Sequence, residues 1–130
     1  LEQRLFVETL LDTFEGDRLG ALQKASTLLT MPMPSGGLFA KKRIARLRRG
    51  IVAFARAFAH ESSAADARAL KQAASSSPLI HWAMRYASAV VAIDQGKKEQ
   101  VPELLAGAPV WPKESAFRSF HEELLTQAGS

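Results

Sequence analysis

Seven Lys and Arg side chains fall within residues 38–60, a segment that contains no Asp or Glu. Arg pairs with carboxylates or phosphates through two parallel hydrogen bonds, so this segment predicts recognition of an anionic partner. At about 100° per residue, part of the cationic set falls opposite the apolar stripe of a predicted helix. The stripe consists of Ile44, Leu47, Ile51, Phe54 and Phe58. The cations opposite it are Lys42, Arg46, Arg49 and Arg56, with Lys41, Arg43 and Arg48 on the flanks.

Three kinds of partner compete for this basic face. A protein with an acidic segment would pair its carboxylates with the arginines. A nucleic acid would use the same cations as phosphate contacts, although no recognition motif or stacking aromatic accompanies them. A membrane surface would also suit the cations, but burial in the domain explains the apolar stripe more simply.

Solvation, or pairing within the chain, is the alternative that requires no partner. The acids available for such pairing in the first predicted hairpin are Glu8, Asp12, Glu15 and Asp17. The residues that we expect to bind a partner are Lys42, Arg46, Arg49 and Arg56, with Arg43 as a second contributor. Trp111 lies beside Pro112 in a predicted loop, where it either fills the core or anchors a partner.

The residue types in the chain give little indication of metal binding, cofactor binding or catalysis. The chain has no cysteine and only three scattered histidines, which predicts no metal site and no cofactor. Neither His81 nor His121 has neighbours at the spacing of a catalytic triad or a zinc-binding helix, so both are interpreted as structural. The sequence therefore predicts a protein that is not an enzyme.

The elements that must position the basic face are helices. The chain has 130 residues, a length that suits a single domain, and its 22 Ala and 16 Leu outnumber 15 Val, Ile and Thr. This composition and the spacing of the apolar residues predict an all-α fold. The expected helices cover about residues 1–15, 17–31, 38–60, 63–75, 78–95, 97–106 and 112–127.

Proline and capping signals divide these helices into units. Pro32 and Pro34 end the second helix, the Ser63 to Asp66 spacing resembles a capping box, and Pro78 suits a first helical position. The expected units cover about residues 1–34, 38–76 and 78–109, followed by a capping helix at 112–127.

Two of these units resemble the tetratricopeptide-repeat superfamily, whose repeats are helix-turn-helix pairs. The matching residues of the first unit are Gly16, Ala21, Leu28 and Pro32 or Pro34. Those of the last are Ala89, Gly96, Val101, Ala108 and Pro112. The spacing is nearer 40 than 34 residues, and Thr9, Asp12, Arg85 and Ala92 stand where the family favours Gly or Tyr.

The resemblance implies stacked antiparallel helical hairpins in a right-handed superhelix, whose first helices line a concave, protein-binding face. An irregular helical bundle is the alternative fold. The expected function is a scaffold that binds an acidic segment of another protein, and the alternative is non-specific nucleic-acid binding. Because the chain opens at Leu1 in a helical pattern, it is interpreted as a possible piece of a longer protein with further repeats. No membrane-spanning segment is predicted, and the cytoplasm is the default compartment.

Overall fold

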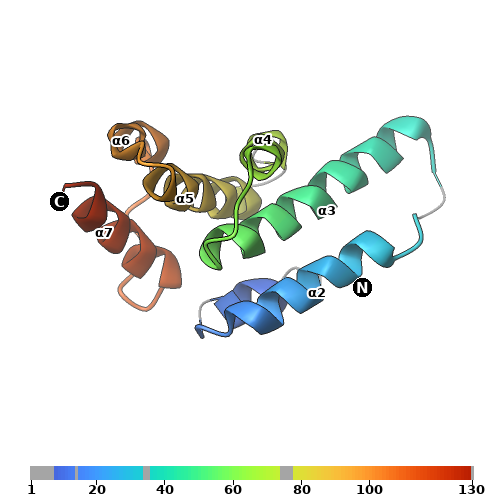
Figure 1. Ribbon diagram of the computed structural model, residues 1–130, viewed down its shortest axis with the longest axis horizontal. Coiled ribbons are helices and arrows are strands. Elements are labelled where there is room, and N and C mark those ends of the chain that lie inside the picture. Colours follow the sequence, from blue (N-terminus) through green and yellow to red (C-terminus); the bar gives the residue numbers. More distant parts are fainter. Residues whose placement is uncertain (1–7, 14, 34–35, 74–77, 130) are drawn as a thin grey trace.

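The computed structural model describes residues 8–13, 15–33, 36–73 and 78–129, and within these ranges the fold is all-α, without strands (Figure 1). Residues 8–13 are helical. The six α-helices that follow are α2 (Arg18–Thr30), α3 (Leu38–Phe58), α4 (Ala64–Ala73), α5 (Pro78–Asp94), α6 (Val101–Leu105) and α7 (Ala116–Ala128), and the short 3-10 helix η1 (Lys98–Gln100) precedes α6. The all-α fold with about seven helices is thus confirmed for the described part of the chain. No helix in these ranges is both long enough and apolar enough to span a bilayer.

The longest helix, α3, turns its apolar stripe toward the core as its period predicts. Ile51, Phe54 and Phe58 are buried, whereas Ile44 and Leu47 are half-buried. α4 crosses α3 closely at Gly50, where a Cβ atom would collide with the Cβ atom of Ala73. The C-terminal half of α3 is therefore enclosed by its neighbours α2, α4 and α5, while its N-terminal half keeps an exposed side.

Consecutive helices from α2 to α7 pack side by side, and α3 with α5 and α5 with α7 form two further packed pairs. The helices α3, α5 and α7 thus form a row to which the others attach (Figure 1). As the sequence predicts, α5 is buried on most sides because it contacts α3, α4, α6 and α7. The largest fully buried side chains of the described core are Leu28, Ile51, Phe54, Leu70, Met84, Tyr86 and Val101. The superhelical, tetratricopeptide-like arrangement stays a prediction.

Three helices of the chain end in the same way. After residues 8–13, α3 and α5, one residue adopts a left-handed backbone conformation, and the next N–H donates to a carbonyl five residues earlier. The left-handed residues are Gly16, His60 and Gly96, with φ of 83°, 60° and 75°. The N···O distances are 2.7 Å from Asp17 to Asp12, 2.9 Å from Glu61 to Arg56 and 2.7 Å from Lys97 to Ala92. The same cap therefore follows residues 8–13, α3 and α5 but not α7, and His60 occupies the place that glycine takes in the other two.

The predicted start of the last helix was wrong. α7 begins at Ala116 rather than at residue 112, because Ser115 is its N-cap and its Oγ accepts a hydrogen bond from the Phe117 N–H at 3.2 Å. Trp111 precedes a proline and is therefore disfavoured in the helical conformation. The predicted helix at 97–106 is likewise shorter, since η1 leads into α6 only at Val101.

Candidate functional site

The α2–α3 hairpin carries an uncompensated positive charge. Residues 18–60 contain nine Lys and Arg and no Asp or Glu. Four of the five predicted binding residues, Lys42, Arg43, Arg46 and Arg49, are exposed on the first 12 residues of α3. Among the described residues, no carboxylate lies within ion-pair distance of these four side chains. The structure thus brings four predicted residues together on one solvent-facing stretch of helix.

Arg56, the fifth predicted binding residue, has a partner inside the protein. Its Nη1 lies 3.3 Å from Oδ1 of Asp66, a buried carboxylate at the start of α4. The other oxygen, Oδ2, accepts hydrogen bonds from the Ser63 N–H at 2.9 Å and the Ser63 hydroxyl at 3.2 Å. Arg56 therefore helps to fix the α3–α4 turn, whereas the other four cations have no ion pair with a described residue.

Arg48, on the flank of the predicted face, is buried rather than exposed. It donates from Nη1 to the Met31 carbonyl at 2.8 Å and from Nη2 to the Pro32 carbonyl at 3.1 Å. These carbonyls follow the last turn of α2, where helical partners are lacking. Arg48 thus fastens α3 to the end of α2.

Two of the acids considered as internal partners for the basic face have other roles. Asp12 lies 2.9 Å from Nζ of Lys24 on α2, and this carboxylate raises the pKa of the lysine above its ordinary value. The Asp17 carboxylate caps α2 by accepting a hydrogen bond from the Gly20 N–H at 2.9 Å. Both carboxylates therefore act between the helix at 8–13 and α2.

Sequence analysis missed the apolar side chains beside the cations. Leu38 and Phe39, in the first turn of α3, are 66% and 87% exposed. A signal was present, because Phe39 lies about 100° around the helix from the centre of the apolar stripe. The helical period alone thus indicates that Phe39 does not share the core-facing side of α3.

Trp111 lies at the other end of the molecule, in the α6–α7 connection. Its indole Nε1–H donates to the buried Tyr86 hydroxyl at 2.6 Å, and its ring packs on Phe117 with centroids 4.9 Å apart. The Tyr86 hydroxyl in turn lies 3.1 Å from Nδ1 of His121. Trp111 does not share a surface with the basic residues, and its polar atom is satisfied within the domain.

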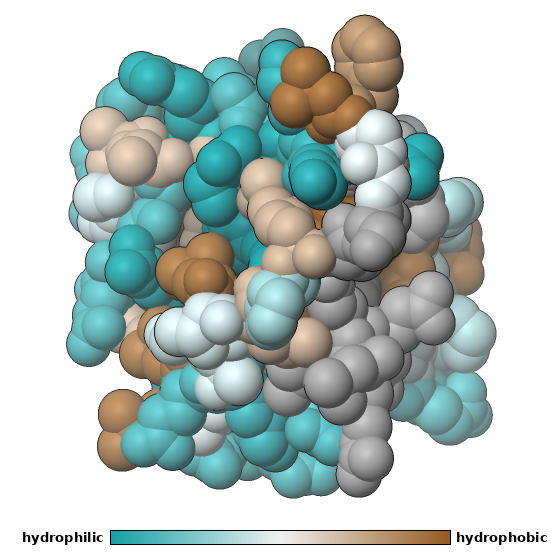
Figure 2. All heavy atoms as spheres, turned by 90° about the vertical axis from the view of Figure 1, so that its right-hand side faces the viewer, coloured by the Kyte–Doolittle hydropathy of each residue, from teal (hydrophilic) through white to brown (hydrophobic). Residues whose placement is uncertain are grey.

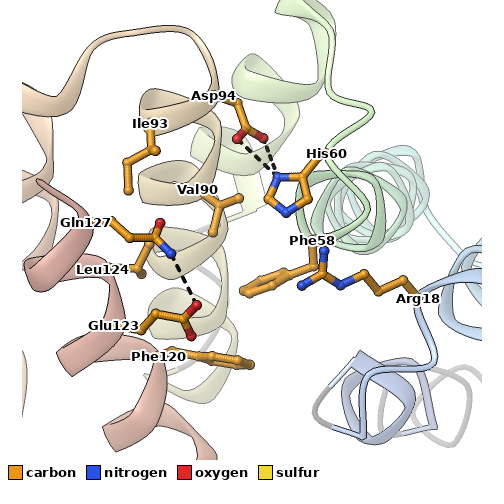
Figure 3. A pocket seen from close by; sticks show the side chains of 10 residues that line it. All are labelled: Arg18, Phe58, His60, Val90, Ile93, Asp94, Phe120, Glu123, Leu124 and Gln127. Atoms are coloured by element: carbon orange, nitrogen blue, oxygen red, sulfur yellow. Dashed lines mark hydrogen bonds and ion pairs between the residues drawn. The ribbon is translucent and has the colours of Figure 1, made fainter. Parts of the chain in front are cut away.

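A small groove of about 80 Å³ opens where α3, α5 and α7 meet (Figure 3). Its apolar lining is Phe58, Val90, Ile93, Phe120 and Leu124, and its polar residues are Arg18, His60, Asp94, Glu123 and Gln127. Figure 3 shows His60 and Asp94 together at one edge, with Nδ1 of His60 2.8 Å from Oδ2 of Asp94. Phe58 is about 160° around α3 from Lys42 and about 180° from Arg49, so the groove lies on the other side of this helix from these two cations.

No group of three His, Asp or Glu side chains within the described ranges is close enough to hold a metal ion. His121 contacts Tyr86, and the His81 ring packs edge-on against Trp82 with centroids 5.1 Å apart. Among the described residues, Lys42, Arg43, Arg46 and Arg49 are thus a group of neighbouring exposed cations without a carboxylate partner.

Comparisons with protein-family models, with curated protein sequences and with solved structures find no match to this chain.

Proposed function

We propose that this chain is a non-enzymatic helical scaffold module that binds an acidic segment of another protein through the exposed side of α3. The observation that carries the proposal is the row of Lys42, Arg46 and Arg49, which is exposed and has no carboxylate partner among the described residues. Without carboxylate partners, these cations repel one another, and this repulsion destabilises the folded state. A partner that bears carboxylates would reduce the repulsion.

The spacing of the row defines what it can recognise. Lys42, Arg46 and Arg49 follow one another at i, i+4 and i+7, so they extend about 10 Å along one side of the helix. Arg43 lies beside this row, and each guanidinium offers a planar fork to a carboxylate. A partner segment with two or three carboxylates at similar spacing would pair with the row.

The scaffold part of the proposal rests on the repeated arrangement. Consecutive helices pack in order, α3, α5 and α7 form a row, and the same left-handed cap follows residues 8–13, α3 and α5. These features favour a stack of helical hairpins related to tetratricopeptide repeats. We propose the cytoplasm as the compartment of this protein.

The test places a photo-crosslinking amino acid at Ala45, which lies in α3 beside the row, and exposes the folded chain to lysate of the source cells after nuclease treatment. We expect one protein to crosslink through a segment rich in Asp and Glu. The double change Arg46→Glu and Arg49→Glu should reduce this product at least about tenfold, because two forks become repulsive charges. The control change, Lys97→Glu with Lys113→Glu, alters net charge equally on exposed residues elsewhere and should leave the product intact.

Survival of the crosslink in the Arg46 and Arg49 variant would refute the proposal. Crosslinks to nucleic acid alone would favour the alternative function. Binding would then fall steeply between about 50 and 200 mM salt, because phosphate contacts release counterions.

A further inference from the structure

The end of the α2–α3 hairpin exposes large apolar side chains. These side chains form the apolar tip, and their exposed fractions are 51% for Leu29, 43% for Met33, 66% for Leu38 and 87% for Phe39. Figure 2 views the molecule from the side on which this hairpin ends and shows apolar residues at the surface among hydrophilic ones. Single exposed apolar residues are ordinary, but several at one hairpin end indicate a surface that leaves water on binding.

Three cations lie directly behind the apolar tip. Lys41, Lys42 and Arg43 are all exposed, and they follow Phe39 by about 3–6 Å along the helix axis. They point in directions about 100° apart, so they are distributed around α3 rather than along one side. Helical side chains lean toward the N-terminus, so the three charged side chains lean toward the tip, as Phe39 does.

This order of apolar groups followed by cations matches the layers of an anionic membrane surface. Apolar side chains enter the boundary between headgroups and acyl chains to a depth of about 5–10 Å, and Lys and Arg remain at the level of the phosphates. A plane facing the end of the helix can meet all three cations, whereas a partner at one side of α3 meets only some of them. A nucleic acid would satisfy the charges but would leave the exposed Phe39 unexplained.

We propose that the apolar tip docks end-on to an anionic membrane surface, with Leu38 and Phe39 among the lipid headgroups and Lys41, Lys42 and Arg43 at the phosphates. This inference does not depend on the acidic protein partner proposed above. Arg46 and Arg49 lie about 10 and 15 Å from Phe39 along the helix axis, which leaves Arg49 beyond the inserted layer. The two contacts therefore share Lys42 and Arg43. Phe39 is specific to the membrane contact, and Arg46 and Arg49 are specific to the protein contact.

The test is flotation of the purified chain with phosphatidylcholine vesicles, either pure or containing about 30% phosphatidylglycerol. We expect the chain to float with the anionic vesicles only. Phe39→Ser should weaken partitioning about tenfold, because the buried phenyl area is lost. Lys42→Gln with Arg43→Gln should weaken it roughly thirtyfold, since each cation contributes about fivefold near such a surface.

Matched controls separate the tip from general surface effects. Val110→Ser removes an apolar side chain that is 94% exposed in the α6–α7 connection, and Lys97→Gln with Lys113→Gln removes the same net charge elsewhere. Both controls should float like the unmodified chain. In a Phe39→Trp variant, lipids brominated in the acyl chain should quench the added fluorescence.

The proposal fails if the chain stays unbound with anionic vesicles, or if Phe39→Ser floats as well as the unmodified chain. It also fails if pure phosphatidylcholine vesicles bind equally, or if Phe39→Trp is not quenched. Retained crosslinking to an acidic protein together with absent flotation would overturn the membrane inference alone, whereas the reverse result would overturn only the protein-binding proposal.

Discussion

The Nδ1 atom of His60 lies 2.8 Å from Oδ2 of Asp94, so His60, two residues beyond the end of α3, is joined to the last residue of α5. His60 has φ of 60°, whereas Gly16 and Gly96 occupy the corresponding caps of two other helices. A side chain at such a position costs about 1 kcal/mol relative to glycine. The contact with Asp94 compensates for part of this cost.

His60→Gly and His60→Ala should therefore differ in the free energy of unfolding. The glycine variant loses the contact with Asp94 but also loses the backbone strain, so we expect a change within about 0.5 kcal/mol. The alanine variant loses the contact and keeps the strain, and it should be about 1 kcal/mol less stable than the glycine variant. Urea unfolding measures both values, and equal stability of the two variants would contradict this account of the cap.

Arg48 and Arg49 are adjacent in sequence, but truncation of their side chains should change the free energy of unfolding by very different amounts. Arg48→Ala removes the donors to the Met31 and Pro32 carbonyls and should destabilise the protein by about 2–3 kcal/mol. Arg49→Ala changes an exposed side chain and should stay within about 0.5 kcal/mol. Thermal or urea unfolding of the two variants checks this, and a loss below about 0.5 kcal/mol in Arg48→Ala would show that burial of Arg48 does not stabilise the fold.

Gly50→Ala should destabilise the domain by about 1–3 kcal/mol, because the added methyl group meets the Cβ atom of Ala73 and forces α3 and α4 apart. Adding Ala73→Gly removes the opposing atom. The double variant should thus be more stable than Gly50→Ala alone, although glycine has a lower helix propensity than the alanine it replaces in α4. Urea midpoints compare the variants, and a double variant that is weaker still would place the strain elsewhere.

Because of Tyr86, the stability of the domain should change with pH in the alkaline range. Burial raises its pKa above the ordinary value of 10, and the hydrogen bond from Trp111 offsets part of this increase. The folded state therefore keeps the phenol proton longer than the unfolded state does. The stabilisation from this group is complete below pH 10 and is lost as the pH rises through the raised pKa.

Because Tyr86 is the only tyrosine, the ultraviolet absorbance of its phenolate reports this titration directly. The midpoint should lie above 10 in the folded protein and rise further in Trp111→Phe, which lacks the donor that favours the phenolate. The Tyr86→Phe variant should lose stability less steeply with rising alkaline pH. A midpoint at or below the ordinary value would contradict the burial of this hydroxyl.

Local features of the sequence determined most of the helices of this protein. Apolar period and Ala and Leu content place α3 and α5 and predict which side of α3 is buried, because these properties depend on residues a few positions apart. The same properties predicted the wrong first residue for α7. This helix begins at Ala116 rather than near Pro112 because Ser115 is the residue that caps it. The absence of Asp and Glu from residues 18–60 was also evident from the sequence, and it marks the α2–α3 hairpin as the basic part of the chain.

The tertiary structure alone decided which cations of α3 are available to a partner. Arg48, Arg49 and Arg56 belong to one helix and one residue type, yet Met31 engages the first and Asp66 the last. These partners come from the end of α2 and the start of α4, so no spacing within α3 reveals them. The tertiary structure likewise decided the exposure of Phe39, because α4 crosses α3 at Gly50 and the first turns of α3 extend beyond that crossing. Side-chain availability is a property of packing between segments, whereas helix formation is largely a property of each segment.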